Sequence, residues 1–149
     1  GGSLGERLSV QVREVMITDE GIPMVVLGSQ TRCAIQEMDS KRLGATLVVD
    51  EQGRLAGIIT DGDLRRALLR HEDVYNIPVE GVMSSATKTI DEDQTAAEAL
   101  GLMELHAITH LAIVDEQKKV KGIVHLHDLL GREHFRLNGP SLADRETAR

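Results

Sequence analysis

Two stretches of the chain carry nearly the same pattern of residues. Residues 47–60 read LVVDEQGRLAGIIT, and residues 112–125 read AIVDEQKKVKGIVH. An Asp-Leu pair follows each stretch, and one offset of 65 residues relates the two copies (115 − 50, 122 − 57 and 128 − 63). A repeated unit implies two similar substructures, because one copy alone does not bury its apolar face. We therefore expect a pseudo-two-fold arrangement, with the functional site in the crevice between the copies.

Each copy is predicted to fold as strand, helix, strand, strand, helix. The first copy is expected to form strands at 24–27, 46–49 and 55–60 and helices at 31–42 and 61–70; the second is expected to form strands at 87–90, 111–114 and 120–125 and helices at 95–106 and 126–133. Gly53 suits a hairpin turn that needs a positive φ. Lys118 takes its place in the second copy, which predicts a strained or differently formed turn. The expected fold class is α+β, with two βαββα units, small sheets and helices on one face.

The domain organisation follows from the repeat. We assign residues 1–9 to a cloning remnant and linker, 10–71 to repeat 1, 72–78 to a connector, 79–133 to repeat 2, and 134–149 to a partly disordered tail. The chain begins Gly1-Gly2-Ser3 without an initiator Met, so a fragment of a longer protein is expected. Its 149 residues suffice for one compact domain or two small ones.

Composition argues against several function classes. The net charge of −7 disfavours nonspecific binding to phosphate backbones, and the near absence of aromatic residues removes a base-stacking platform. No apolar stretch approaches a membrane span, and no signal peptide is recognisable. The single cysteine, Cys33, excludes an internal disulfide and fits a reducing compartment such as the bacterial cytoplasm. Because Cys33 falls within a predicted helix, we expect it to be a buried structural thiol.

The segment from Gly57 to Asp63 carries the clearest chemical pattern. It reads GIITDGD, a buried strand that delivers a hydroxyl and then a carboxylate to the start of a helix. A helix N-terminus and a Thr hydroxyl together suit a phosphate, and the Asp63 carboxylate suits a vicinal diol such as ribose. The alternative is that Thr60 ends a strand and Asp63 only caps a helix. A nucleotide would satisfy the functional interpretation.

These residues resemble a tandem CBS-domain pair, or Bateman module. The resemblance covers about residues 10–132 and includes the segments VREVM at 12–16 and VEGVM at 79–83, as well as the Gly-x-x-Thr-x-x-Asp strand ends. It implies an adenine nucleotide or similar metabolite in the cleft between the repeats. It also implies that Thr60 and Asp63 hold phosphate and ribose, with Ile22 and Pro23 beside the base.

A narrower resemblance is to the C-terminal CBS pair of bacterial arabinose-5-phosphate isomerases. It is carried by TDGDLRRAL at 60–68 and HLHDLL at 125–130. This resemblance implies a regulatory half whose catalytic partner, an N-terminal sugar isomerase domain of the Kdo and lipopolysaccharide pathway, lies outside this chain. The implied signals are AMP, ADP, ATP or CMP-Kdo, with no cofactor required.

The second repeat departs from the CBS pattern because His125 stands where the Thr belongs. Imidazole also donates to phosphate or carboxylate, so this position is either a ligand contact or a structural residue. Arg65 or Arg66 is a candidate phosphate contact. The complete set of candidate ligand-binding residues is Ile22, Pro23, Thr60, Asp61, Asp63, Arg65, Thr87, Lys88, His125 and Asp128.

Other functions fit the sequence less well. The histidine spacing permits a zinc site, but no cysteine joins it and we expect no metal. We also expect no catalytic residues in this fragment, since no pair of carboxylates is set up for acid–base chemistry. The main alternative is an oligomerisation module without a physiological ligand. Such a module, like the homodimer expected for either function, would use apolar residues of the last helices: Leu64, Leu68, Leu129 and Leu130.

Overall fold

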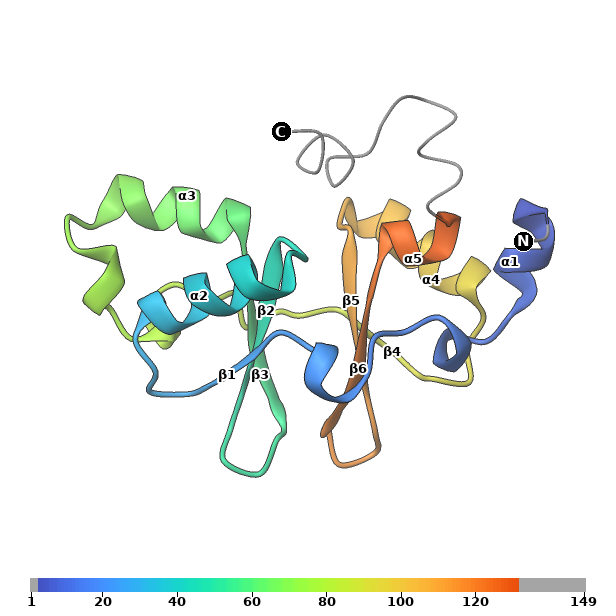
Figure 1. Cartoon of the computed structure of the whole chain (residues 1–149), viewed down its shortest axis with the longest axis horizontal. Coiled ribbons are helices and arrows are strands. Elements are labelled where there is room, and N and C mark those ends of the chain that lie inside the picture. The colour runs from blue at the N-terminus through green and yellow to red at the C-terminus, as the bar shows by residue number, and fades with distance from the viewer. Residues whose placement is uncertain (1–2, 132–149) are drawn as a thin grey trace.

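The computed structural model describes residues 3–131 of the chain. Within this range, two three-stranded sheets form, and helices cover the outer face of each (Figure 1). The strand orders are β1-β2-β3 and β4-β5-β6; the first pair in each sheet is parallel, and the second is an antiparallel hairpin. The predicted α+β fold class is therefore confirmed.

In chain order, the α-helices and strands are α1 (Leu4–Ser9), β1 (Met24–Val26), α2 (Thr31–Lys41), β2 (Ala45–Val49), β3 (Leu55–Thr60), α3 (Asp61–Arg70), β4 (Thr89–Ile90), α4 (Ala96–His106), β5 (His110–Val114), β6 (Val120–His125) and α5 (Leu126–Leu130). Short 3₁₀ turns are η1 (Val12–Glu14), η2 (Asp19–Gly21), η3 (Val74–Asn76) and η4 (Val79–Gly81).

The two hairpins have the same turn in spite of their different residues. Gly53 adopts φ +80° and Lys118 adopts φ +66°, so both occupy the left-handed region. In each turn an Asp side chain accepts two backbone N–H bonds: Asp50 from Gln52 and Arg54, and Asp115 from Gln117 and Lys119, all at 2.8–3.0 Å. The second turn is therefore not differently formed; Lys118 accepts the strained conformation that Gly53 adopts freely.

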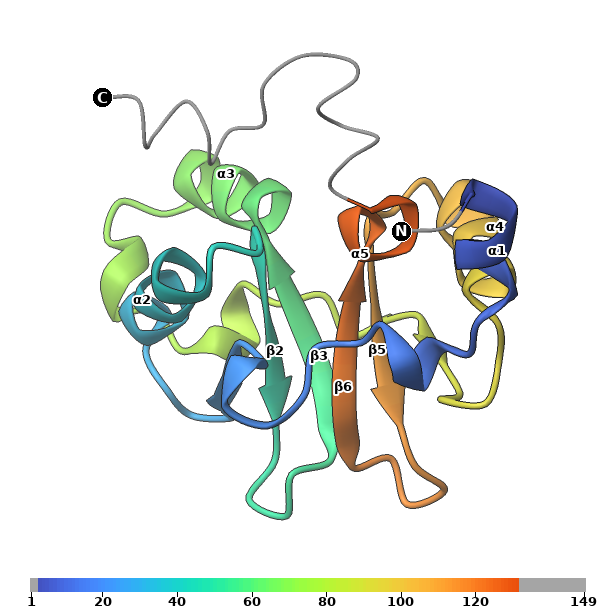
Figure 2. The same cartoon turned by 45° about the vertical axis from the view of Figure 1, so that its right-hand side comes forward.

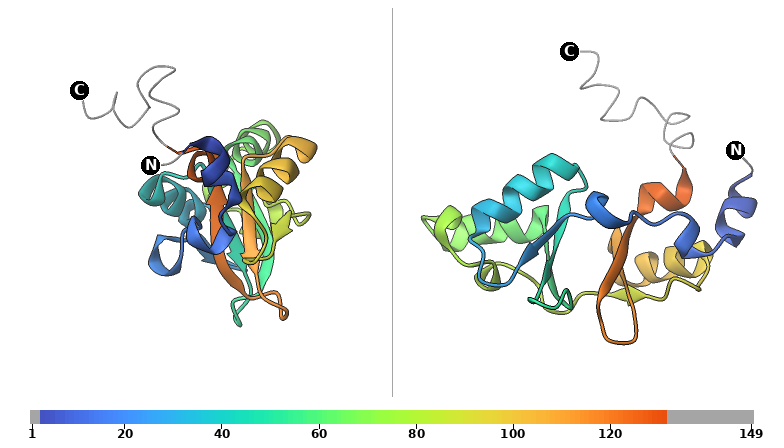
Figure 3. Two further views of the ribbon diagram at one scale, coloured as in Figure 1. Left: turned by 90° about the vertical axis from the view of Figure 1, so that its right-hand side faces the viewer. Right: turned by 60° about the horizontal axis from the view of Figure 1, so that its bottom comes forward.

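The segments that lead into the two repeats are exchanged between them. We call residues 11–17 the first leading segment and residues 78–84 the second. The bridges that define the exchange are Gln11–Thr95 and Ile17–Ile123 for the first segment, and Pro78–Gln30 and Ser84–Ile58 for the second. Each segment thus pairs with the sheet and helix start of the other repeat, and Figure 3 shows the two connections crossing the molecule in opposite directions.

Two equivalent glycines permit this exchange. A Cβ at Gly57 would lie 2.7 Å from the Ser84 carbonyl oxygen, and a Cβ at Gly122 would lie 2.8 Å from the Ile17 carbonyl oxygen. Backbone atoms do not yield at such distances, so only glycine allows each leading segment to lie against its strand. The first Gly of the Gly-x-x-Thr-x-x-Asp pattern is therefore a packing requirement.

The core has three parts. One apolar cluster lies between sheet and helices in each repeat, and a third joins the two sheets through Leu47, Ile58, Ala112 and Ile123. Figure 2 shows β3 and β6 side by side at this junction. The hairpin ends are also bonded to each other, from Leu55 N–H to the Lys118 oxygen at 2.9 Å and from Val120 N–H to the Gly53 oxygen at 3.0 Å. The two repeats therefore form one body with a shared interior.

Some local predictions differ from the structure. Cys33 is exposed on α2, so the expectation of a buried thiol is wrong; the buried face of that helix consists of Thr31, Ala34 and Met38. Helix α5 ends at Leu130 because Gly131 adopts φ +79°. Residues 4–9, assigned to a linker, form α1, which packs against α4 and α5. The predicted tail, 134–149, lies outside the described residues.

Candidate ligand site between the repeats

The junction from β3 to α3 is held by a reciprocal capping box. The Thr60 hydroxyl accepts from the Asp63 backbone N–H at 3.2 Å and donates to Asp63 Oδ2 at 3.0 Å. Asp63 Oδ2 also accepts from the Thr60 backbone N–H at 2.9 Å, and Asp63 Oδ1 accepts from the Arg66 guanidinium at 2.8 Å. In this state the Thr60 hydroxyl and both Asp63 oxygens have protein partners. The capping role weighed in the sequence analysis is therefore present.

The junction from β6 to α5 is built similarly around an imidazole. The backbone N–H of His125 donates to Asp128 Oδ2 at 2.8 Å, as Thr60 does to Asp63. His125 Nδ1 accepts from the backbone N–H of His127 at 2.9 Å. Because Nδ1 is an acceptor, the neutral ring carries its proton on Nε2. The ring thus caps α5 with one nitrogen and keeps a donor on the other.

Three histidine rings meet beside this junction. The His125 ring contacts those of His110 and His127 edge to face, with centroid separations of 4.7 and 4.2 Å. Burial, followed by the neighbouring His110 and His127, lowers the pKa of His125 to about 4. Burial also lowers the pKa of His110, against the opposing effect of its 2.6 Å hydrogen bond from Nε2 to the Leu43 carbonyl oxygen. Both rings are therefore neutral near pH 7.

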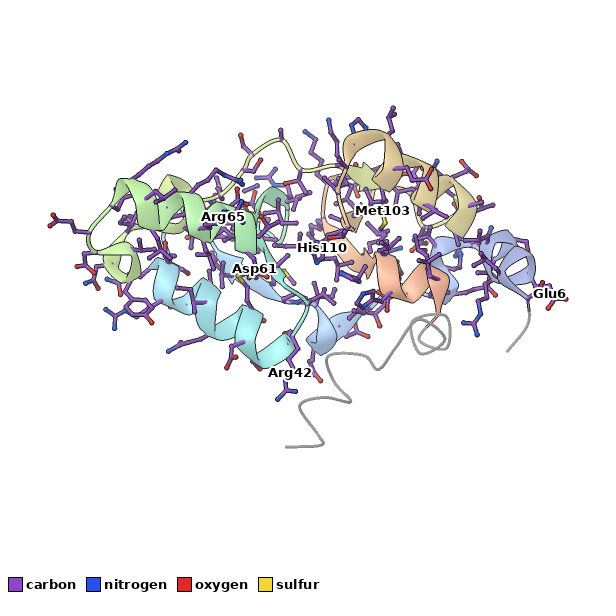
Figure 4. The ribbon with its side chains drawn as sticks, turned by 90° about the horizontal axis from the view of Figure 1, so that it is seen from above. Glu6, Arg42, Asp61, Arg65, Met103 and His110 are labelled. Atoms are coloured by element: carbon purple, nitrogen blue, oxygen red, sulfur yellow. The ribbon has the colours of Figure 1, made fainter. Side chains whose placement is uncertain are left out.

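A cleft of about 670 Å³ opens between the repeats at these junctions. This volume is typical of sites for small metabolites. Figure 4 shows Asp61 and His110 on the two sides of the meeting point, one from each repeat. The lining residues come from the loop before β2, the end of β3 with the start of α3, the segment before β4, the turn between α4 and β5, and the end of β6. The polar ones among them are Thr60, Asp61, Asp63, Arg66, Ser84, Thr87, Lys88, His106, Thr109, His110 and His125.

The structure brings together six of the ten candidate residues. Those that line the cleft are Thr60, Asp61, Asp63, Thr87, Lys88 and His125. Ile22 and Pro23 are buried and do not line it; Ile22 belongs to the apolar cluster between the sheets. Arg65 is exposed outside the lining, and Asp128 caps α5. Ser84, Thr87 and Lys88 line the cleft together with Thr60 and Asp63, because the second leading segment packs on repeat 1.

Sequence reasoning missed part of the cleft wall. Arg66, weighed equally with Arg65, is the arginine that reaches the site, three residues after Asp63 on the same helix face. The turn from His106 to His110 forms the opposite wall. A signal for His110 was present, since it pairs with His125 in the hairpin register as Ala45 pairs with Thr60.

One hydroxyl in the cleft wall is unsatisfied. Thr87 Oγ1 is buried and has no hydrogen-bond partner in the structure. A buried hydroxyl without a partner costs about 1–3 kcal/mol. A ligand oxygen within reach of this hydroxyl would supply the missing acceptor.

No group of three or more His, Cys, Asp or Glu side chains among residues 3–131 is arranged to hold a metal ion. None of the helices in this range has the length and apolar run needed to cross a membrane.

Comparison with protein families identifies the repeat. The model of the CBS domain matches twice, at residues 12–70 and 79–134. The chain is a tandem pair of CBS domains. Each matched range contains one strand-to-helix junction of the cleft, so the two junctions are the same position of two copies of one domain.

Relatives of this CBS pair belong to longer proteins. Arabinose 5-phosphate isomerase KdsD of Pseudomonas aeruginosa is 48% identical over 130 residues, which cover 87% of this chain and 40% of that protein. KdsD of Escherichia coli K12 is 36% identical over 130 residues, with 87% and 39% covered. The chain therefore spans about two-fifths of the curated relatives it matches.

Solved structures share the fold. The CBS domain pair of protein MJ0100, in complex with 5′-methylthioadenosine and S-adenosyl-L-methionine, has a TM-score of 0.71 and 24% identity, covering 87% of this chain and 96% of that one. CBSX2 in complex with AMP has a TM-score of 0.70 and 18% identity, covering 86% and 98%.

Proposed function

We propose that this CBS pair is a regulatory module that binds a nucleotide or nucleotide sugar between its repeats. The observation that carries the proposal is the cleft itself. It combines a metabolite-sized volume with hydroxyls, carboxylates, cations and imidazoles supplied by both repeats. A ligand that contacts both walls favours one arrangement of the repeats, and that differential affinity is what transmits a signal.

The cleft residues have roles that fit such a ligand. Asp63 is assigned to the ribose diol, which would replace Arg66 at Oδ1, and the released Arg66 and Lys88 are then free to contact phosphate. Thr60 lies at the start of α3, where backbone N–H groups favour an anion. Thr87 supplies the unsatisfied hydroxyl. In this proposal Asp61 flanks the phosphate side, and His125 and Asp128 belong to the altered site of repeat 2. The roles expected for Arg65 at the phosphate and for Ile22 and Pro23 beside the base are not part of it, because these residues lie outside the cleft lining.

The candidate ligands are AMP, ADP, ATP and CMP-Kdo. Adenine-containing ligands are favoured by the two solved CBS pairs named above, which hold AMP or 5′-methylthioadenosine and S-adenosyl-L-methionine. CMP-Kdo is favoured by the KdsD relatives, because it is a downstream product of the pathway that such an isomerase supplies.

We further propose that the parent protein is an arabinose-5-phosphate isomerase of the bacterial cytoplasm, in the pathway to Kdo and lipopolysaccharide. The identity with KdsD and the two-fifths coverage support it. An N-terminal sugar isomerase domain would perform the aldose–ketose conversion, and the CBS pair would regulate it without catalysing a step.

The test is a thermal-shift screen of the purified chain against AMP, ADP, ATP, S-adenosylmethionine, CMP and CMP-Kdo, followed by calorimetry. A ligand at a hundredfold excess over its Kd stabilises the folded state by about 2.7 kcal/mol. We expect one compound to raise the Tm with dose, and Asp63→Ala to abolish the rise. The matched control is Glu98→Ala, which removes the capping carboxylate of α4 outside the cleft lining. No shift with any compound would count against the proposal.

A second candidate function, self-association, has an observation of its own. Leu68 and Leu69 on α3 are 67% and 84% exposed, whereas Leu129, predicted to serve an interface, is 1% exposed and belongs to the core. A homodimer through α3 would bury the two exposed leucines. We expect a dimer by sedimentation equilibrium that Leu69→Gln weakens; a monomer at all concentrations would exclude this function.

A further inference from the structure

The two repeats are joined differently at the two ends of β3 and β6. At the hairpin end, the tips hold each other by the two backbone hydrogen bonds of 2.9 and 3.0 Å described above. The middle is the apolar cluster between the sheets, whose contacts have no fixed direction. At the cleft end a side chain makes the connection, since His110 Nε2 of repeat 2 lies 2.6 Å from the Leu43 carbonyl oxygen of repeat 1. A relative rotation of the repeats therefore pivots at the hairpin tips and opens at the cleft end.

The bond from His110 has a defined direction. A carbonyl oxygen only accepts, so Nε2 carries the proton. The Thr109 hydroxyl lies 3.1 Å from Nδ1 and donates to it, which the same neutral tautomer requires. The ring of His125 packs edge to face on the imidazole, with the centroids 4.7 Å apart. Both nitrogens and the ring itself are thus held in place for the bond between the repeats.

The two loops joined by this bond each support the start of a helix. The Gly44 oxygen accepts from the backbone N–H of Asp61, the first residue of α3, at 3.2 Å. The Thr109 oxygen accepts in the same way from Leu126, the first residue of α5, at 2.9 Å. The His110 bond connects the loops at the residues next to these two acceptors. It therefore links the start of α3 to the start of α5 across the interface.

The fold of the repeat does not require this bond. The offset of 65 residues makes Ala45 the counterpart of His110, and Ile108 the counterpart of Leu43. The Ala45 side chain has no donor and is buried in the apolar cluster between the sheets, so the reciprocal bond does not form. Packing alone suffices at that position of repeat 1. The imidazole is an added connection on one side of the pseudo-two-fold arrangement.

We propose that His110 is a latch at the cleft end of the interface between the repeats. In the latched state the bond from Nε2–H to the Leu43 oxygen holds the starts of α3 and α5 at a fixed separation. In the open state this bond is broken, and the repeats rotate apart about the hairpin tips. The inference goes beyond the proposed function because it names the bond that a change of repeat arrangement breaks. It rests on contacts within the fold and does not depend on which ligand, if any, the cleft binds.

The test measures the separation of the repeats with a pair of spin labels. Cys33 is the single cysteine of the chain and is exposed on α2, and Leu105 is 75% exposed on α4. Figure 1 shows α2 and α4 on opposite sides of the two sheets. The variant Leu105→Cys therefore provides one labelling site on each repeat. Pulsed electron paramagnetic resonance between two nitroxides then reports the distribution of distances, without any ligand present.

The decisive variant in this labelled chain is His110→Phe, which keeps a ring and removes the Nε2 donor. We expect it to raise the population of longer distances about threefold to tenfold, the effect on an equilibrium of losing one net hydrogen bond. His110→Gln keeps an N–H donor of similar reach and should restore most of the latched population. The matched control is His71→Phe at the exposed C-cap of α3, which should leave the distribution unchanged.

Two distance results would overturn the inference. If His110→Phe leaves the distribution as in the parent chain, then the hairpin tips, the apolar cluster and the leading segments fix the separation without a latch. If His71→Phe shifts the distribution equally, the change reflects general loosening. Nitrogen-15 NMR of the unlabelled wild type decides the matter if His110→Phe does not fold. It should show the Nε2–H tautomer for His110 with a slowly exchanging proton, and a Nδ1–H tautomer or a rapidly exchanging proton would exclude the latch.

Discussion

The two strand-to-helix junctions are the same position of one repeated domain, but they differ in what they offer a ligand. Repeat 1 presents Asp61, Asp63 and Arg66 around a hydroxyl whose hydrogen bonds are internal. The equivalent positions of repeat 2 are Leu126, Asp128 and Gly131, which keep only the cap carboxylate. Three histidines of repeat 2, His110, His125 and His127, stand at the positions equivalent to Ala45, Thr60 and Gly62 of repeat 1. The helix cap is thus the shared structural requirement, and the residues around it are where the copies have diverged.

The largest expected effect tests what the copies still share. Gly57→Ala and Gly122→Ala should each destabilise the fold by about 1–3 kcal/mol, because the new Cβ meets the backbone oxygen of a leading segment. Urea unfolding measures both. Gly101→Ala is the control: this helical glycine has open space around it, so Ala should stabilise by about 1 kcal/mol. A loss at only one of the two strand glycines would show that the leading segments are not equivalently packed.

The next largest effect is a pH dependence of stability that arises from His125 in repeat 2. The pKa of His125 is about 4 in the fold against about 6.5 unfolded, so the unfolded chain binds more protons between these values. Stability should be complete above pH 6.5 and fall by about 1–2 kcal/mol as the pH drops toward 4, an amount that allows for solvent screening of a partly exposed ring. Urea midpoints across this range measure it. His125→Thr should flatten the slope, and an unchanged slope would assign the effect to other groups.

A smaller effect compares the two caps. Asp63→Ala and Asp128→Ala each remove the carboxylate that accepts the N-cap backbone N–H, so each should cost about 1 kcal/mol of unfolding free energy. Thermal unfolding measures the loss. An unchanged Tm in either variant would show that its cap carboxylate adds nothing to stability.

The smallest effect lies in the hairpin turns. Lys118→Gly should stabilise by about 0.5 kcal/mol, because relief of the left-handed conformation exceeds the added entropy of the unfolded chain. The reverse change, Gly53→Lys, should destabilise by about 1 kcal/mol. A destabilising Lys118→Gly would mean that the Lys118 side chain makes a contribution that the turn geometry does not require.

Local patterns in the sequence determined most of the elements. The repeat, the hairpins and the helix starts were all predictable from short apolar runs for the strands, Asp-initiated turns and Thr-x-x-Asp caps. The turns and caps make their hydrogen bonds within a few residues. The same locality predicted that Thr60 and Asp63 would lie together. An element whose hydrogen bonds are made within a few residues is predictable, because the residues that form it are adjacent in the sequence.

Only the tertiary structure decided which distant segments meet. The exchange of the leading segments places Thr87 and Lys88, rather than Ile22 and Pro23, in the cleft with Asp63. The strand register brings His110 against His125, and helix packing leaves Cys33 in solvent. These outcomes depend on close packing between backbone segments that are far apart in the chain. The leading segments pack where they do because Gly57 and Gly122 have no Cβ to exclude them. No periodicity within a single segment encodes that choice.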